Sequence, residues 1–116
     1  MSVAFDGIGS LAVTFRCSGQ VEAGTPVVLS DNETVAAATA GKAPAGVALH
    51  QRGDYAAVQI QGYVKLPYTG TAPALGQQAL VADGIKGVKT AGSGETGRTC
   101  LVVRVDTEAG TVGLFL

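Results

Sequence analysis

The sequence contains few side chains that could carry out a reaction. His50 is the single histidine of the chain, and Asp54 is the nearest carboxylate that follows it. A histidine and a carboxylate exchange protons with a substrate when they lie within hydrogen-bond reach of it. Here a turn is expected between the two residues, and no nucleophile stands beside them. We therefore interpret His50 as a surface histidine, and a lone histidine also does not form a metal site.

Two short motifs resemble ligand-binding or recognition sequences. Residues 92–97 read G-S-G-E-T-G and fit the spacing of a dinucleotide-binding loop. That loop must be followed by a helix whose first turn meets the phosphates, whereas residues 98–103 are strand formers. The integrin-type tripeptide Arg52-Gly53-Asp54 falls where a hairpin turn needs glycine. Both motifs are therefore interpreted as loops or turns.

The remaining residues of reactive type, two aspartates and two cysteines, are explained by structural roles. Asp31 and Asp83 could form a pair of catalytic carboxylates, but each is followed by Asn or Gly and is typical of a tight turn. Cys17 and Cys100 are far apart and form no CxxC or Cys/His pattern, which favours reduced, buried thiols over a disulfide. These residues predict a protein that is not an enzyme and that holds neither a metal nor a cofactor.

The composition favours one small domain. The chain has 116 residues, and a domain of this size buries roughly two-thirds of the surface that its unfolded chain exposes. Charged residues make up 15%, against about 25% in typical globular chains. Either a partner covers much of the surface, or Ser, Thr, Gln and Gly solvate it.

The charge and hydropathy patterns exclude several classes of partner. The net charge is -1 and no basic cluster occurs, so nucleic acid is not expected to bind. No apolar run approaches the ~18 residues of a membrane helix. The N-terminal residues also lack a secretion signal, because no basic region precedes the apolar residues. A soluble protein without a membrane partner is predicted.

Glycine and proline divide the sequence into many short segments that are rich in strand-forming residues. This pattern predicts an all-β sandwich or barrel. Asp83-Gly84 is a hairpin signal between two of the strands. We expect strands at residues 11–17, 26–30, 33–38, 45–50, 55–61, 63–66, 78–82, 85–89, 98–105 and 111–116.

One stretch of sequence occurs twice, 52 residues apart. Residues 21–32 resemble residues 73–84, so that Gly24 matches Gly76 and the run 27–29 matches 79–81. Each copy leads to another apolar strand, at residues 45–49 and at 100–103. Such self-similarity predicts a fold built from repeated units. We expect one β domain at residues 11–116, made of two similar β units at about 21–67 and 73–116.

Residues 1–10 do not fit the strand pattern. They include the apolar Val3 and Phe5, but Asp6, Gly7 and Gly9 interrupt them. They are predicted to be an extended N-terminal arm. Terminal arms are poorly ordered unless something holds them, and the two apolar side chains favour an arm that orders on a partner.

The order of several motifs resembles a known family. The sequence reads V-E-A-G-T-P-V-V-L at 21–29, P-A-G-V-A-L at 44–49 and A-V-Q-I-Q-G-Y-V-K-L-P at 57–67, and the pattern continues through 75–81 and 101–105. Over about residues 21–105, this order and spacing resemble the small capsid decoration, or cement, proteins of tailed bacteriophages. Each motif alone is structural, and it is their order that carries the resemblance.

The resemblance implies a compact β-barrel or β-tulip domain on the outside of an icosahedral capsid. Such proteins commonly bind as homotrimers at three-fold and quasi-three-fold positions of the expanded shell, where they bridge subunits of the major capsid protein and stabilise the head. The protein would then be made in the host bacterial cytoplasm and reside in the virion. In several members an N-terminal arm pairs with a capsid strand, so the candidate capsid-binding residues are Ser2, Val3, Ala4, Phe5, Asp6 and Ile8.

Two other functions remain open at this point. The chain could be another virion or tail component that uses the same β unit. It could also be a small-ligand or carbohydrate-binding module, with a pocket lined by Tyr55, Tyr63 or Tyr68. An enzyme would require a turnover that depends on His50 or Asp54.

Overall fold

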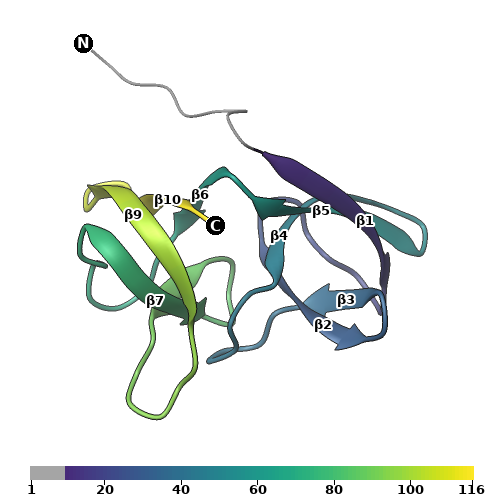
Figure 1. Ribbon diagram of the computed structural model, residues 1–116, viewed down its shortest axis with the longest axis horizontal. Helices are drawn as coiled ribbons and strands as arrows, with labels where there is room; N and C mark the ends of the chain where they lie inside the picture. Colours follow the sequence, from purple (N-terminus) through teal and green to yellow (C-terminus); the bar gives the residue numbers. More distant parts are fainter. Residues whose placement is uncertain (1–9) are drawn as a thin grey trace.

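Two five-stranded β-sheets, formed by successive parts of the chain, make up the fold (Figure 1). The computed structural model describes residues 10–116. The first sheet contains β1 (Leu11–Cys17), β2 (Pro26–Asp31), β3 (Thr34–Ala37), β4 (Gly46–Arg52) and β5 (Tyr55–Gln61). The second contains β6 (Tyr63–Pro67), β7 (Gly76–Ala82), β8 (Val88–Thr90), β9 (Arg98–Asp106) and β10 (Thr111–Phe115). The predicted all-β class is confirmed.

The first sheet closes into a barrel with the strand order β1-β3-β2-β4-β5. β5 pairs with β1 in antiparallel fashion, and β1 pairs with β3 in parallel fashion at Arg16 and Cys17. The barrel is narrow, and small side chains fill it, as is usual for small barrels. Its buried side chains are those of Val21, Val27, Val35, Ala48, Ala56 and Val58.

The second sheet has the order β6-β10-β9-β7-β8 and a core of larger side chains. Leu66, Leu80 and Leu114 are each no more than 1% exposed. Val47 of β4 belongs to this second core although its strand lies in the first sheet. The two sheets therefore share packing at their junction.

Both sheets have the same topology. If β1–β5 are matched in order to β6–β10, the first sheet reads β3-β2-β4-β5-β1 and the second reads β8-β7-β9-β10-β6. The parallel pair of Cys17 with Val35 has its counterpart in a single parallel bridge of Tyr68 with Val88. A register irregularity also occurs in the equivalent strand pairs, β4–β5 and β9–β10. The two sheets are therefore similar β units, but their bounds differ from the predicted 21–67 and 73–116. β1 belongs to the first unit, and β6 belongs to the second because it pairs with β10.

The sequence match at 52 residues is one residue out of register within the strands. Val27 pairs with Ala37, and the equivalent pair in the second sheet is Leu80 with Thr90, which is 53 residues further on. Val27 and Leu80 are both fully buried, whereas Ala79 is exposed. A slip of one residue moves every side chain to the opposite face. The match of residues 27–29 with 79–81 was therefore wrong, because the glycines of the preceding loops dominated it.

Most predicted strands agree with the structure to within two residues, but the strand at 85–89 is an exception. Residues 83–87 form a turn in which a carboxylate oxygen of Asp83 accepts hydrogen bonds from the N–H groups of Ile85 (2.7 Å) and Gly87 (3.1 Å). The following strand begins at Val88. Asp83-Gly84 is thus part of a longer turn and not a two-residue hairpin.

Replacing Asp83 with alanine should lower the free energy of unfolding by about 1 kcal/mol, because two backbone N–H groups lose their acceptor. Urea unfolding followed by circular dichroism measures this change. Glu108→Ala is the matched control, because Glu108 is an exposed turn residue whose own N–H is bonded to Asp106. An equal loss in both variants would contradict the role of the Asp83 carboxylate.

Polar contacts join the two sheets. The guanidinium group of Arg98, at the start of β9, donates hydrogen bonds to the carbonyl oxygens of Ala45 (2.9 Å) and Ile60 (2.9 Å) in the first half of the chain. The loop before β4 also bonds to the end of β7, where Ala82 donates its N–H to Lys42 (2.8 Å). These contacts fix the position of one sheet against the other.

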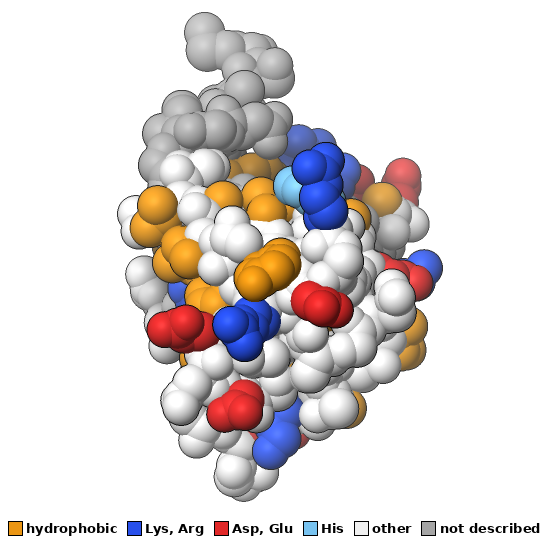
Figure 2. Space-filling view, turned by 90° about the vertical axis from the view of Figure 1, so that its right-hand side faces the viewer, with side chains coloured by type: hydrophobic (Ala, Val, Ile, Leu, Met, Phe, Trp, Pro, Cys, Tyr) orange, Lys and Arg blue, Asp and Glu red, His pale blue; other side chains and the backbone are white. Residues whose placement is uncertain are grey.

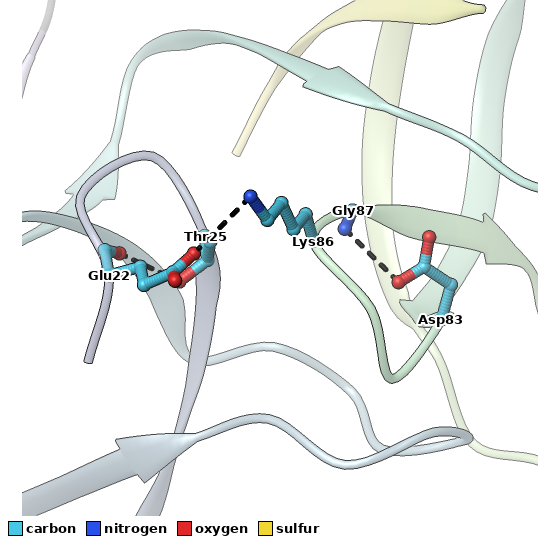
Figure 3. Close-up of polar contacts among 5 residues, drawn as sticks. All are labelled: Glu22, Thr25, Asp83, Lys86 and Gly87. Atoms are coloured by element: carbon cyan, nitrogen blue, oxygen red, sulfur yellow. Dashed lines mark hydrogen bonds and ion pairs between the residues drawn. The ribbon is translucent and has the colours of Figure 1, made fainter. Parts of the chain in front are cut away.

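Figure 3 shows a further contact at this junction, between the turn before β2 and the turn before β8. The ammonium group of Lys86 lies 3.7 Å from a carboxylate oxygen of Glu22. On either side, Thr25 donates its hydroxyl to the carbonyl of Glu22, and Gly87 donates its N–H to Asp83. Both members of the ion pair are about two-thirds exposed, so the pair adds little stability.

Candidate functional site: the free edge of strand β1

The residue types that could do chemistry are not gathered into one site. His50 is exposed on β4, and Asp54 lies in the β4–β5 turn, where Gly53 has a φ of 59°. This agrees with the interpretation of Arg52-Gly53-Asp54 as a turn. Among residues 10–116, no group of three or more His, Cys, Asp or Glu side chains is placed to hold a metal ion.

The carboxylates that the sequence singled out bond to their own turns. Asp31 accepts a hydrogen bond from the N–H of Asn32 (2.7 Å), and Asp83 serves the 83–87 turn as described above. In the glycine-rich loop 92–97, Glu95 accepts a hydrogen bond from the N–H of Gly92 (2.7 Å). The strand β9, not a helix, follows this loop. Each of these residues therefore has a structural role.

Both cysteines are free thiols. Cys100 is buried and Cys17 is half-buried. Burial raises the pKa of both thiols, and the nearby charge of Asp54 adds to the increase at Cys17. The thiols therefore remain protonated at neutral pH, and the thiolate is the reactive form of cysteine. The prediction of two reduced thiols agrees with this arrangement, although Cys17 is less buried than expected.

The predicted capsid-binding residues of the arm, Ser2, Val3, Ala4, Phe5, Asp6 and Ile8, lie outside the described residues. The described chain begins at Ser10, which lies against Gly62 at the junction between the two sheets. A Cβ atom at Gly62 would lie 2.8 Å from the Cα of Ser10. Ser10 therefore places the start of β1 at this junction.

The N-terminal half of β1 has a free edge. Cys17 donates its N–H to Asp54 next to β5 (2.8 Å), while Arg16 donates to Glu33 next to β3 (2.9 Å). The backbone groups of successive strand residues point to opposite sides of the strand. Ala12 and Thr14 are an even number of residues from Arg16, so their backbone groups point, like those of Arg16, away from β5. β3 pairs with β1 only at Arg16 and Cys17. Within the described chain, the N–H and C=O groups of Ala12 and Thr14 therefore face no partner strand.

Apolar side chains accompany this edge. Leu11 is 47% exposed and Val13 is 37% exposed, although both have the same orientation along β1 as Phe15, which packs on the barrel core. β1 thus extends past the core, and its first residues have nothing to cover them among residues 10–116. The edge carries neither a charge nor a proline from Leu11 to Phe15.

The corresponding edge of the second sheet is blocked. In β1, Thr14 and Arg16 pair with Ala57 and Tyr55 of β5. The equivalent pairs in the second sheet are those of Lys65 with Gly113 and of Pro67 with Thr111. Lys65 and Pro67 of β6 therefore occupy the positions of Thr14 and Arg16. Pro67 has no N–H, and its carbonyl oxygen lies against Gly87. Lysine and proline are two devices by which proteins prevent strands from adding to a sheet edge.

Another side chain occupies the start of this edge. The amide group of Gln59 donates a hydrogen bond to the carbonyl oxygen of Tyr63 (3.1 Å). The same position of a duplicated fold is thus protected in β6 and open in β1. This contrast makes the β1 edge the candidate functional site.

Sequence reasoning missed this site. It identified β1 correctly, but the extent of an edge depends on which strand lies beside it. The pairing of β1 with β3 is parallel and covers two residues, and no local pattern signals it. The lack of charge and proline in residues 11–15 was the one available indication.

Searches of protein-family models and of curated proteins found no match for this chain. In the described part of the chain, the structure contains no helix with the length and apolar character needed to cross a membrane.

Proposed function

We propose that the chain is a structural virion protein that binds the outer surface of the expanded capsid of a tailed bacteriophage. In this role it bridges subunits of the major capsid protein as a homotrimer at three-fold and quasi-three-fold positions, and it stabilises the shell without a catalytic step. The proposal rests on the resemblance of residues 21–105 to capsid decoration proteins and on the free edge of β1.

The free edge is the observation that carries the proposal. An extended segment of another protein can add to such an edge through main-chain hydrogen bonds. Ala12 and Thr14 offer two N–H and two C=O groups, and Leu11 and Val13 offer apolar contact. Residues 1–10 precede this edge in the sequence, so the predicted arm and the edge can contact one partner together.

A weak contact of this size suits a lattice. Linking several binding sites in one particle raises the overall affinity far above that of each site. A protein that binds the expanded shell and not its precursor also stabilises the expanded form by mass action. A trimer that makes three such contacts would bind the shell more tightly than a monomer, and its tighter binding would stabilise the expanded shell further.

The test is sedimentation of the purified protein with expanded capsids that lack it. We expect saturable co-pelleting and an increase in the temperature at which the shells break, with little binding to unexpanded shells. Sedimentation equilibrium of the bound and the free protein tests the trimer. Absence of binding to expanded shells would overturn the proposal, and co-pelleting with tails instead would favour the tail component.

The carbohydrate-binding alternative named a pocket lined by Tyr55, Tyr63 or Tyr68. Tyr55 lies on β5 and lines a shallow depression of the first sheet. The ring of Tyr63 lies over Gly113 of its own sheet. Saturable binding of a glycan that Tyr55→Ala abolishes would favour this alternative over the capsid role.

A further inference from the structure

A row of basic and aromatic side chains crosses the outer face of the barrel. Arg16 of β1, Tyr55 of β5 and Arg52 of β4 lie directly opposite one another in register. In the next row, Ala57 lies between Thr14 and His50. Residues directly opposite across paired strands have their side chains on one face. Three of the nine Lys, Arg and His residues of the chain therefore gather around one tyrosine.

These side chains have no internal partner that explains them. Arg16, Arg52 and His50 are exposed, and Tyr55 is 52% exposed. Within residues 10–116, neither arginine forms a salt bridge, since the one ion pair found is that of Lys86 with Glu22. Figure 2 views the molecule from the β1 side and shows basic side chains beside the pale-blue histidine, close to hydrophobic side chains.

The face is hollowed between these side chains. A shallow depression of about 450 Å³ is lined by Thr14, His50, Arg52, Tyr55, Ala56 and Ala57. Arg16 does not line it but lies opposite Tyr55 on the neighbouring strand. Ala57 leaves the hollow open because its side chain is short. Around it stand a hydroxyl, an imidazole, a guanidinium and a phenol, all of which can donate hydrogen bonds.

The second sheet serves as an internal comparison. By the same strand pairing, Pro67, Thr111 and Asp106 take the places of Arg16, Tyr55 and Arg52. The basic and aromatic row is therefore absent there, and one of its cations is replaced by a carboxylate.

The equivalent hollow of the second sheet is filled from within. Gly113 takes the place of Ala57, and a Cβ atom on Gly113 would collide with the hydroxyl of Tyr63. Tyr63 corresponds to Ala12 of β1, which is too short to reach across its neighbour. The protein's own tyrosine thus covers the second sheet at the position where the first is left open.

We propose that the hollow beside Tyr55 receives a carboxylate side chain of the partner protein. The inference rests on the proposed function for the identity of that partner, and it adds the chemistry that the partner must present. Arginine and tyrosine, with tryptophan, are enriched at the energetic centres of protein interfaces. Arginine also bonds to carboxylates through two parallel N–H groups.

A protein fits this surface better than a nucleic acid. The basic row spans three strands and two registers, whereas nucleic acids bind along an extended basic stripe. The chain as a whole carries a net charge of -1, and Asp54 lies in the turn at the end of the row. A single carboxylate matches this small site, and a polyanion does not.

The hollow and the free edge share Thr14. Its backbone groups point toward the free edge, and its side chain lines the hollow. A strand added at this edge has alternate side chains on the outer face. An Asp or Glu on that face of the docking strand would therefore lie beside the hollow.

The direct test uses two synthetic peptides as probes, acetyl-Thr-Val-Glu-Val-Thr-Val-amide and the same peptide with Gln in place of Glu. Amide signals of the full chain are followed by NMR during titration. The Glu peptide should shift the signals of Thr14, Arg52 and Tyr55, and the Gln peptide should bind about tenfold more weakly. Equal shifts with both peptides would overturn the proposal.

Arginine variants separate the site from general charge. Arg16→Gln combined with Arg52→Gln should weaken binding of the Glu peptide about tenfold and remove its dependence on salt. Arg104→Gln is the matched control, because Arg104 is exposed and occupies the position of His50 in the second sheet. An equal loss with the control would contradict the site. Stronger binding of a thymidine oligonucleotide at the same amides would also overturn it, in favour of a nucleic acid.

The same variants on capsids separate this inference from the proposed function. If the wild-type protein binds expanded shells and the double arginine variant binds them equally well, the carboxylate site is wrong and the capsid role stands. If the peptide results hold and the wild-type protein does not bind shells, the capsid role is wrong and the carboxylate site belongs to another protein partner.

Discussion

Replacing Ala12 with proline should weaken binding to expanded shells about a hundredfold while the β domain remains folded. The N–H of Ala12 points toward the free edge and does not take part in the pairing of β1 with β5. Proline removes this N–H, and its ring prevents a second strand from approaching. Loss of one main-chain bond and disruption of its neighbour together cost about 2–3 kcal/mol, or about a hundredfold in affinity.

Co-pelleting titrations measure the affinity in this experiment, and thermal unfolding shows whether the domain is intact. Two proline variants serve as controls. Lys65→Pro changes an outward-pointing position of the blocked β6 edge and should leave binding unchanged. Val13→Pro removes an N–H that points toward β5 and should destabilise the barrel. If Ala12→Pro binds shells as well as the wild type does, docking at the β1 edge is wrong.

Replacing Arg98 with methionine should lower the free energy of unfolding by about 3 kcal/mol. The guanidinium group donates hydrogen bonds to the carbonyl oxygens of Ala45 and Ile60, and a longer one of 3.4 Å to that of Pro44. Bonds that involve a charged group contribute about 1.5–3 kcal/mol each, and their loss leaves carbonyl groups without a partner. Methionine keeps much of the apolar stem and removes the donors.

Urea unfolding of Arg98→Met and of Arg104→Met measures this effect. Arg104 is an exposed arginine on the same strand, and its replacement should change stability by less than about 0.5 kcal/mol. If the two variants lose equal stability, the bonds of Arg98 across the junction do not hold the sheets together.

Sequence patterns predicted best the strands that have one apolar and one polar face. β1 and β5 were predicted with their observed bounds, because apolar and polar residues alternate clearly in residues 11–17 and 55–61. The predicted start of β8, at residue 85, was wrong. The side-chain carboxylate of Asp83 accepts the hydrogen bonds of the 83–87 turn, so the loop is longer than a two-residue hairpin turn. Such a substitution of side chain for backbone is not visible in a strand pattern.

The duplication was detected in the sequence, but its register was not. Loops of different length separate the strands, so equivalent residues lie 51 positions apart in β1 and β6 (Arg16 and Pro67) and 53 apart in β3 and β8 (Val35 and Val88). A search at one fixed spacing cannot follow both. The comparison of Ala12 with Tyr63, on which the open hollow depends, required the pairing of strands in three dimensions.

The candidate site could not be predicted for a related reason. The extent of a free edge depends on where the neighbouring strand begins or ends, and β3 begins at Thr34, beside Arg16. This pairing joins residues that are distant in the sequence. The predicted capsid-binding residues, Ser2, Val3, Ala4, Phe5, Asp6 and Ile8, precede β1 in the sequence and lie outside the described chain.

The confinement of each strand pair to its own sheet bears on how fast the protein folds and unfolds. The most distant pairings, Leu11 with Gln61 and Tyr63 with Phe115, close loops of nearly equal length, and the entropy of closure changes slowly with length. We therefore expect the strand pairs of each sheet to form without the other sheet being in place. The bonds of Arg98 form when both are in place, so their loss should raise the rate of unfolding and leave the rate of folding nearly unchanged. The lifetime of the native state therefore depends on a side chain that contributes little to reaching it.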